Sequence, residues 1–276
     1  MSGIEEVELK NWKEFEREIE KDRIKYDKLK KATPHHISDL LFRGHSKKEW
    51  KLTTTLERFF RDKNCDHQEY SIKYYHWLLK VVKPAISSLT SAKYELPELD
   101  ESQDFEISIF FKPPPGYELM VYLRHHGFPS PLLDWTVSPY VAAFFAFSEV
   151  RECDDTAIYS YREYIGEAKG GWVKAPRIHG LGPYIHTHKR HYTQQCQYTI
   201  CTKPNENNDG RIYCPHEDVE FGNDQDALKK YIIPGKERKK VLEKLDLMNI
   251  NAFSLFGSEE SLMSTLAYRE IEKGVR

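Results

Sequence analysis

The chain has few cysteines and no long apolar run. Its 276 residues include five cysteines, and the odd count and wide spacing do not match a disulfide framework: Cys65, Cys153, Cys196, Cys201 and Cys214. No apolar run reaches the roughly 18 residues of a membrane-spanning helix. The first residues lack the basic stretch and apolar core of a secretory signal. We therefore expect a soluble protein of a reducing, cytoplasmic compartment, with no membrane partner.

The chain also lacks a dominant charge. It has 41 basic and 43 acidic residues, a formal net charge of −2. Such a chain has no overall attraction to nucleic acid or to an anionic membrane, so binding of an anion would need a local basic patch. Aromatic residues make up 13% of the chain. That share is high enough to exclude disorder and to predict a globular fold.

The hydrophobic pattern predicts alternating helices and strands. Helical spacing is found at residues 8–30, 70–89, 116–127, 138–150, 236–250 and 261–271. Strand patterns are found at residues 39–45, 155–164, 195–201 and 228–234, and residues 128–136 are expected as a proline-rich turn into a short strand. The polar stretches 165–190 and 202–226 are expected as loops. Pro84 is expected to end or kink its helix, Gly127 to end the next, and Ser138 and Pro139 to begin the one after.

No linker separates regions of different composition. We therefore expect one α+β domain with a small mixed sheet flanked by helices. A charged helical segment, residues 1–38, is expected to pack on a main domain formed by residues 39–276.

Arg43 and Gly44 form the first candidate site. An arginine on a strand can present a bidentate fork to a phosphate or carboxylate, and glycine after it lets the backbone approach closely. The alternative is a structural salt bridge with a buried carboxylate, for which Asp134 is the candidate.

Asp134, Trp135 and Thr136 form the second candidate site, before the helix that Ser138 begins. Helix N-termini present unpaired N–H groups that can receive an anion. Trp135 could stack on a flat ring, and Asp134 could orient an arginine or a ribose hydroxyl. The alternative is a helix cap and a core tryptophan.

Two further pairs of polar residues are candidate ligand contacts. His125 and His126, at a helix end, could hydrogen-bond a ligand or act as a general acid, or simply cap the helix. Gln194 and Gln195, at a predicted strand start, could donate to and accept from a ligand, or be ordinary strand residues.

A metal site is not expected. His186, His188 and His191 precede Cys196 and Cys201, but this spacing matches no strong zinc signature. A loop that faces solvent or a phosphate is favoured instead, because Lys189 and Arg190 lie in this stretch.

Three of these segments resemble the FRG domain, a family named after its Phe-Arg-Gly motif. They are residues 42–46 followed by Trp50, Leu52 and Arg58, residues 125–146 with the sequence Leu133-Asp134-Trp135-Thr136, and residues 194–199 with Gln194-Gln195; a weaker segment follows at 232–256. The family usually has arginine where Pro131 stands and glycine where Cys196 stands. If that arginine binds an anion in relatives, this chain has lost the contact or supplies it from another place.

The order of these pieces is also similar in outline to the ADP-ribosyltransferases. By that resemblance Arg43 would hold the phosphates or ribose of NAD, Thr136 would line the nicotinamide pocket, and Gln194 or Gln195 would occupy the catalytic glutamate's place. Glutamine cannot supply that residue's negative charge, so Asp134 is the substitute. The expected site has Arg43, Asp134 and Gln195 as catalytic residues, and Gly44, His126, Trp135, Thr136 and Gln194 as cofactor-binding residues.

Three function classes follow. The first is an NAD-consuming enzyme, a glycohydrolase or ADP-ribosyltransferase, with NAD as cofactor. The second is a non-catalytic module that binds a small nucleotide, a nucleic acid or a protein partner, with a role in bacterial or phage conflict. The third and weakest is a metal-dependent hydrolase or nuclease.

Overall fold

The computed structural model describes residues 3–33, 37–63, 71–99, 113–166, 169, 175–205, 210–221 and 225–273. Its strands are β1 (Glu5–Glu8), β2 (Leu41–His45), β3 (Leu133–Thr136), β4 (Asp155–Tyr164), β5 (Arg177–Gly180), β6 (Cys196–Pro204), β7 (Arg211–Tyr213) and β8 (Gln225–Pro234). Its α-helices are α1 (Trp12–Ala32), α2 (Thr55–Lys63), α3 (Ile72–Leu89), α5 (Tyr117–His125), α6 (Pro139–Phe147), α7 (Lys189–Thr193), α8 (Arg238–Leu247), α9 (Ala252–Phe256) and α10 (Glu259–Ala267).

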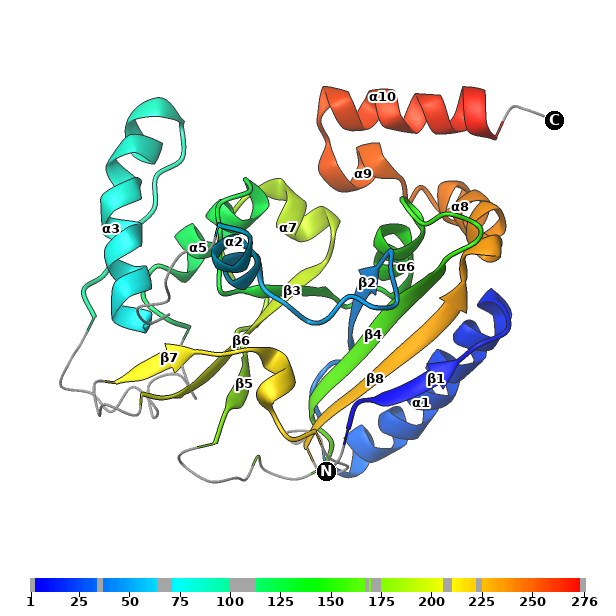
Figure 1. Ribbon diagram of the computed structural model, residues 1–276, viewed down its shortest axis with the longest axis horizontal. Helices are drawn as coiled ribbons and strands as arrows, with labels where there is room; N and C mark the ends of the chain where they lie inside the picture. Colours follow the sequence, from blue (N-terminus) through cyan, green and yellow to red (C-terminus); the bar gives the residue numbers. More distant parts are fainter. Residues whose placement is uncertain are drawn as a thin grey trace.

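The strands form one eight-stranded sheet among the described residues (Figure 1). Its order is β1-β8-β4-β2-β3-β6-β5, with β7 paired to β6. The β1–β8 pair is parallel, and the other pairs are antiparallel. The predicted α+β class, mixed sheet and single domain are therefore confirmed.

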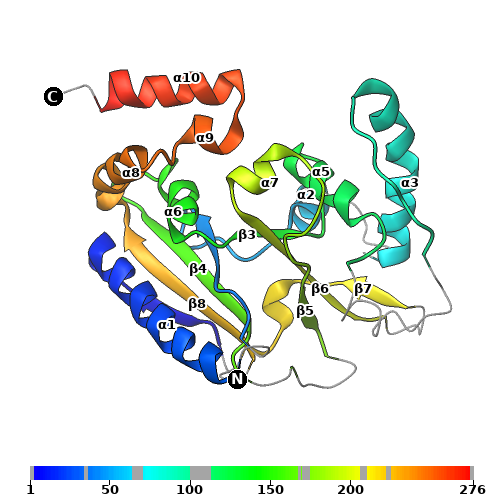
Figure 2. The same cartoon turned by 180° about the vertical axis from the view of Figure 1, so that it is seen from behind.

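The sheet is weakest between β2 and β3. These strands share one register pair, Phe42 with Thr136, whereas β4 pairs with β8 from Asp155 to Tyr164. Figure 2 shows the two halves diverging on either side of this junction, with β1, β8, β4 and β2 in one and β3, β6, β5 and β7 in the other. Side chains of both β2 and β3 line a cavity at this junction.

Helices α1, α6 and α8 cover one face of the first half. Trp12 and Phe15 of α1 pack in one buried cluster with Phe147 of α6, Tyr231 of β8 and Val241 of α8. The cluster anchors the charged N-terminal helix by its apolar side. The boundary between residues 1–38 and 39–276 stays a prediction.

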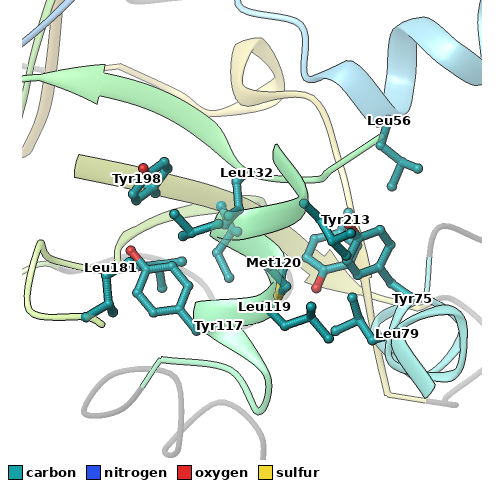
Figure 3. Close-up of a cluster of buried hydrophobic side chains, with 14 of the residues drawn as sticks. Leu56, Tyr75, Leu79, Tyr117, Leu119, Met120, Leu132, Leu181, Tyr198 and Tyr213 are labelled. Carbon is teal, nitrogen blue, oxygen red and sulfur yellow. The ribbon is translucent and has the colours of Figure 1, made fainter. Parts of the chain in front are cut away.

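Helices α3 and α5 cover the second half. Figure 3 shows their cluster, in which Tyr117, Leu119 and Met120 of α5 lie between Tyr75 of α3 and Tyr198 of β6. All five side chains are at most 4% exposed. This packing fixes α5, whose last turn carries Arg124 and His125.

Local signals set the ends of the elements around the space between β2 and β3. Gly127 has φ +84°, and the Phe128 N–H donates to the Leu123 carbonyl (3.0 Å), which closes α5 as predicted. Ser138 Oγ accepts from the Val141 N–H (3.3 Å), and Pro139 is the first residue of α6, also as predicted.

Pro84 does not end its helix, because α3 continues through it to Leu89, with Pro84 on the exposed side. The kink expected there stays a prediction. Other predictions were wrong. Strands β5 and β7 lie in stretches expected as loops, since each is short and joined to the sheet through β6. Strand β1 was not predicted, because most of its side chains are exposed and polar.

No described helix is long and apolar enough to cross a membrane. Cys153, Cys196, Cys201 and Cys214 are free thiols, and Cys65 lies outside the described residues.

Candidate functional site

A cavity of about 730 Å³ lies where β2 and β3 diverge. Arg43 of β2 and Asp134 of β3 both line it, together with Arg124 at the end of α5. The cavity is thus bounded by the junction of the two half-sheets and by a helix fixed in the core of the second half.

The alternation of β2 sends Arg43 toward this cavity. Leu41, Arg43 and His45 point to one face of the strand, and Phe42 and Gly44 point to the other. Gly44 lies against the backbone of α6, and a Cβ there would be 1.9 Å from the carbonyl oxygen of Ala142. Glycine is therefore required for the close approach of α6, which holds β2 in place.

Asp134 is held between two arginines. Arg43 Nη1 donates to Asp134 Oδ1 (2.6 Å) and to the Asp134 carbonyl oxygen (2.7 Å). Arg124 Nη2 donates to the same Oδ1 (2.7 Å). The predicted contact between Arg43 and Asp134 is therefore present, as part of a three-residue network.

This network keeps Asp134 ionised. Burial alone would raise the pKa of Asp134, but the guanidinium groups of Arg124 and Arg43 outweigh it and hold the pKa well below its ordinary value. A carboxylate in this state cannot deliver a proton at neutral pH. It can orient the two arginines and supply a negative charge.

His45 accepts a hydrogen bond from Arg43. Arg43 Nε donates to His45 Nε2 (3.0 Å), and His45 Nδ1 donates to the Trp50 carbonyl oxygen (3.2 Å). Burial and the charge of Arg43 lower the pKa of His45 to about 3. His45 is therefore neutral at pH 7 and can accept from Arg43 without adding charge.

More cations line the cavity than the sequence motifs indicated. Its lining includes six basic side chains and three carboxylates. Arg58 of α2 forms no side-chain hydrogen bond or ion pair with any described residue, and Arg190 of α7 donates only to the carbonyl oxygens of His125 and Phe256. Burial lowers the pKa of Arg58, and repulsion by the charges of Arg43 and Arg124 lowers it further.

Four other predicted residues line the cavity, although their side chains are engaged in the fold. Trp135 is 3% exposed, and its Nε1–H donates to Thr199 Oγ1 (2.9 Å). Thr136 Oγ1 accepts from the Ser138 N–H (3.1 Å) before α6. Gln194 is buried and donates to the Leu255 carbonyl oxygen (3.1 Å), and Gly44 contributes backbone. These surroundings favour the alternative of a helix cap and a core tryptophan.

His126 and Gln195 do not line the cavity. His126 is exposed at the end of α5, where its ring lies 4.3 Å from that of Tyr122 and 4.9 Å from that of His188. Gln195 is exposed in the turn between α7 and β6, with φ +50°. The strand begins one residue later than predicted, because the turn out of α7 uses Gln194 and Gln195. The roles predicted for both residues stay predictions.

The histidines and cysteines predicted to lack a metal role lie apart. His191 is buried against Tyr198, with its rings stacked at 5.7 Å, and Cys201 faces Cys214 at 3.4 Å between sulfur atoms. Among the described residues, no group of three histidine, cysteine or acidic side chains is placed to hold a metal ion.

The predicted site did not include Arg124, Arg58 or Arg190. Arg124 immediately precedes the paired histidines and lies ten residues before Asp134, which was the available signal. Arg58 lies in the first segment that resembles the family, and Arg190 lies in the stretch predicted to face solvent or a phosphate. Helices α2 and α7 bring these two arginines to the cavity.

The comparisons with known proteins identify one family. Residues 38–155 match the model of the FRG domain. This segment contains Arg43, Arg58, Arg124 and Asp134. No curated protein and no solved structure matches the chain. The matched segment, with the motifs within it, shows that this chain contains an FRG domain.

Proposed function

We propose that the cavity binds a nucleotide through its phosphates. The observation that carries the proposal is the charge of the lining: Arg43, Arg58, Arg124 and Arg190 have Asp134 as their one carboxylate partner among the described residues. Guanidinium forks match the geometry of phosphate oxygens, and an anion would relieve their mutual repulsion.

The size and shape of the site favour a small ligand. A volume of about 730 Å³ lies within the ordinary range of small-molecule sites. The arginines line a cavity, whereas a nucleic acid would need cations along an open surface. Trp50, Phe145 and Phe256 also line it, and Trp50 is 43% exposed. Their rings are candidates to stack on a base, a role for which Trp135 is too deeply buried.

NAD is the first nucleotide to test. The outline shared with ADP-ribosyltransferases supports this choice by analogy alone. Cleavage of NAD would require a negative charge close to the forming oxocarbenium ion. Asp134 carries one, although two arginines bind it, and the exposed Glu49 and Glu149 line the same cavity. The alternative is a module that binds the nucleotide unchanged.

Calorimetric titration with NAD, ADP and adenosine tests the proposal. We expect NAD and ADP to bind and adenosine, which lacks phosphate, to bind far more weakly. Arg58→Gln should weaken NAD and ADP binding by about 10- to 100-fold, the effect of one charge-assisted hydrogen bond. Arg151→Gln is the matched control, because the Arg151 side chain is 77% exposed and lies outside the cavity lining. Equal binding of ADP and adenosine would contradict the proposal.

Chromatography of the same mixtures distinguishes an NAD-consuming enzyme from a module that binds NAD unchanged. Nicotinamide release by the wild type, lost in folded Arg43→Ala and Asp134→Ala variants, would establish an NAD-consuming enzyme. Intact NAD after saturable binding would establish a binding module. A steep decrease of affinity with salt would indicate a polyanion in place of a mononucleotide.

A further inference from the structure

A chain of hydrogen bonds leads from the core to the cavity. It begins at the Pro183 carbonyl oxygen, which lies 2.9 Å from His191 Nε2. His191 Nδ1 lies 3.2 Å from the Tyr198 hydroxyl, and that hydroxyl lies 2.7 Å from His125 Nε2. Tyr198 is fully buried in the cluster of Figure 3, and His125 lines the cavity.

The first atom of this chain fixes the direction of every proton. A carbonyl oxygen can only accept, so His191 Nε2 carries a proton and donates to Pro183. A neutral imidazole has one N–H, so His191 Nδ1 must accept, and it accepts the one proton of the Tyr198 hydroxyl. The Tyr198 oxygen is then free to accept from His125 Nε2. His125 therefore holds its proton on Nε2 and a lone pair on Nδ1.

The surroundings support this assignment. Burial lowers the pKa of His125 to about 4 and also lowers the pKa of His191, so both rings are neutral at pH 7. The Cys196 thiol is the other polar group near Tyr198, and it donates to Gln194 Oε1 (3.7 Å). Its sulfur is a weak acceptor, so the Tyr198 proton is better placed on the imidazole nitrogen of His191.

His125 Nδ1 is the unused end of the chain. It makes no hydrogen bond with any described residue, and it is not closed off from solvent. We propose that His125 Nδ1 is held as a hydrogen-bond acceptor facing the cavity, where it selects a phosphate ligand that carries a hydroxyl, as a ribonucleotide does. This inference rests on the proposed function, because it names the class of nucleotide.

An acceptor at this place complements the arginines. Arg43, Arg58 and Arg124 can only donate hydrogen bonds, and the Asp134 oxygen nearest them already accepts from two guanidinium groups. They suit the phosphate oxygens, which only accept, but offer nothing to a hydroxyl proton. His125 follows Arg124 directly in α5, so the acceptor lies beside the donors. A ribose hydroxyl next to a phosphate would meet both.

The tautomer can be measured without a ligand. Long-range ¹⁵N–¹H correlation spectra of the full chain, labelled at histidine, should show His125 and His191 protonated at Nε2 and neutral at pH 7. In Tyr198→Phe the His125 ring loses its partner, and its signals should shift toward a mixture of tautomers. A His125 proton on Nδ1 in the wild type would overturn the inference.

The ligand class is tested with AMP and 2′,3′-dideoxyAMP, which share the phosphate and differ in the ribose hydroxyls. We expect the wild type to bind AMP about 2- to 10-fold more tightly, the effect of one neutral hydrogen bond. His125→Phe should abolish this ratio while binding of 2′,3′-dideoxyAMP is kept. Tyr198→Phe should reduce the ratio. If Tyr198 only stabilised the fold, its replacement would leave this ratio of affinities unchanged.

His186→Phe is the control, because His186 is exposed and lies outside the cavity lining. It should keep the wild-type ratio. Equal affinity of the wild type for the two probes would overturn the inference while leaving nucleotide binding intact. Failure to bind either probe would overturn the proposed function and the ligand class with it, and the spectra would still decide the tautomer.

Discussion

Replacing Asp134 with asparagine should have two effects of opposite sign. The carboxylate accepts from Arg43 at 2.6 Å and from Arg124 at 2.7 Å, and these side chains are 13% and 17% exposed. Asparagine keeps one acceptor oxygen but removes the charge. We therefore expect a less stable protein whose cavity attracts anions more strongly than that of the wild type.

The size of the loss follows from the contacts. Each charge-assisted hydrogen bond contributes about 1.5–3 kcal/mol, against about 1 kcal/mol for a neutral one. The Asp134 side chain is 29% exposed, so solvent screening reduces the difference. The Asp134 carbonyl oxygen still accepts from Arg43 in the variant. The expected loss is about 2 kcal/mol of unfolding free energy, or about 4–8 °C in Tm.

Thermal unfolding with and without pyrophosphate is the assay. Pyrophosphate should raise the Tm of Asp134→Asn more than that of the wild type, because a ligand stabilises by an amount that grows with its affinity. Asp246→Asn is the matched control: Asp246 accepts from Arg269 (2.7 Å) and Lys273 (3.4 Å) outside this cavity. It should lose stability without gaining a response to pyrophosphate. An Asp134→Asn protein as stable as the wild type, or one with no stronger response, would refute the reasoning.

Three further predictions concern stability. Because the folded pKa of Asp134 is well below its ordinary value of about 3.9, its stabilisation is fully present above that value and is lost progressively as pH falls toward the folded pKa; in urea unfolding, the stability difference between the wild type and Asp134→Asn should start to shrink below about pH 5 and continue to shrink as the pH is lowered further. Gly44→Ala places a Cβ 1.9 Å from the Ala142 carbonyl oxygen and should cost about 3 kcal/mol or more, seen as a large fall in Tm. Gly127→Ala meets open space but must adopt φ +84°, so its Tm loss should correspond to about 1 kcal/mol.

Local signals predicted the element ends around the cavity. Gly127, Ser138 and Pro139 act through their own backbone and nearest neighbours, so one sequence is enough to interpret them. The contact between Arg43 and Asp134 joins residues 91 apart in the chain, and the chemistry of the two side chains offered it as the alternative to a ligand contact of Arg43. Strand periodicity also explains Trp135, which packs with Leu133 in the core while Asp134 points the other way.

The remaining residues of the site depend on tertiary packing. Arg58 reaches the cavity because Leu56 is buried and orients α2, and Arg124 does so because the apolar side of α5 packs on β6. Neither orientation is encoded near the arginine itself. The acceptor on His125 depends on Tyr198 and His191, which lie on different elements, so the sequence pattern could indicate the histidine but not its tautomer.

Binding of a nucleotide in this cavity can be tested with a crystal structure of the protein with NAD. We expect NAD in the cavity between β2 and β3, with phosphate oxygens within hydrogen-bond distance of Arg58 and of Arg43 or Arg124, and with Asp134 still bound between its two arginines. NAD phosphates bound elsewhere, or an empty cavity at millimolar NAD in crystals where nothing blocks its entrance, would contradict this expectation.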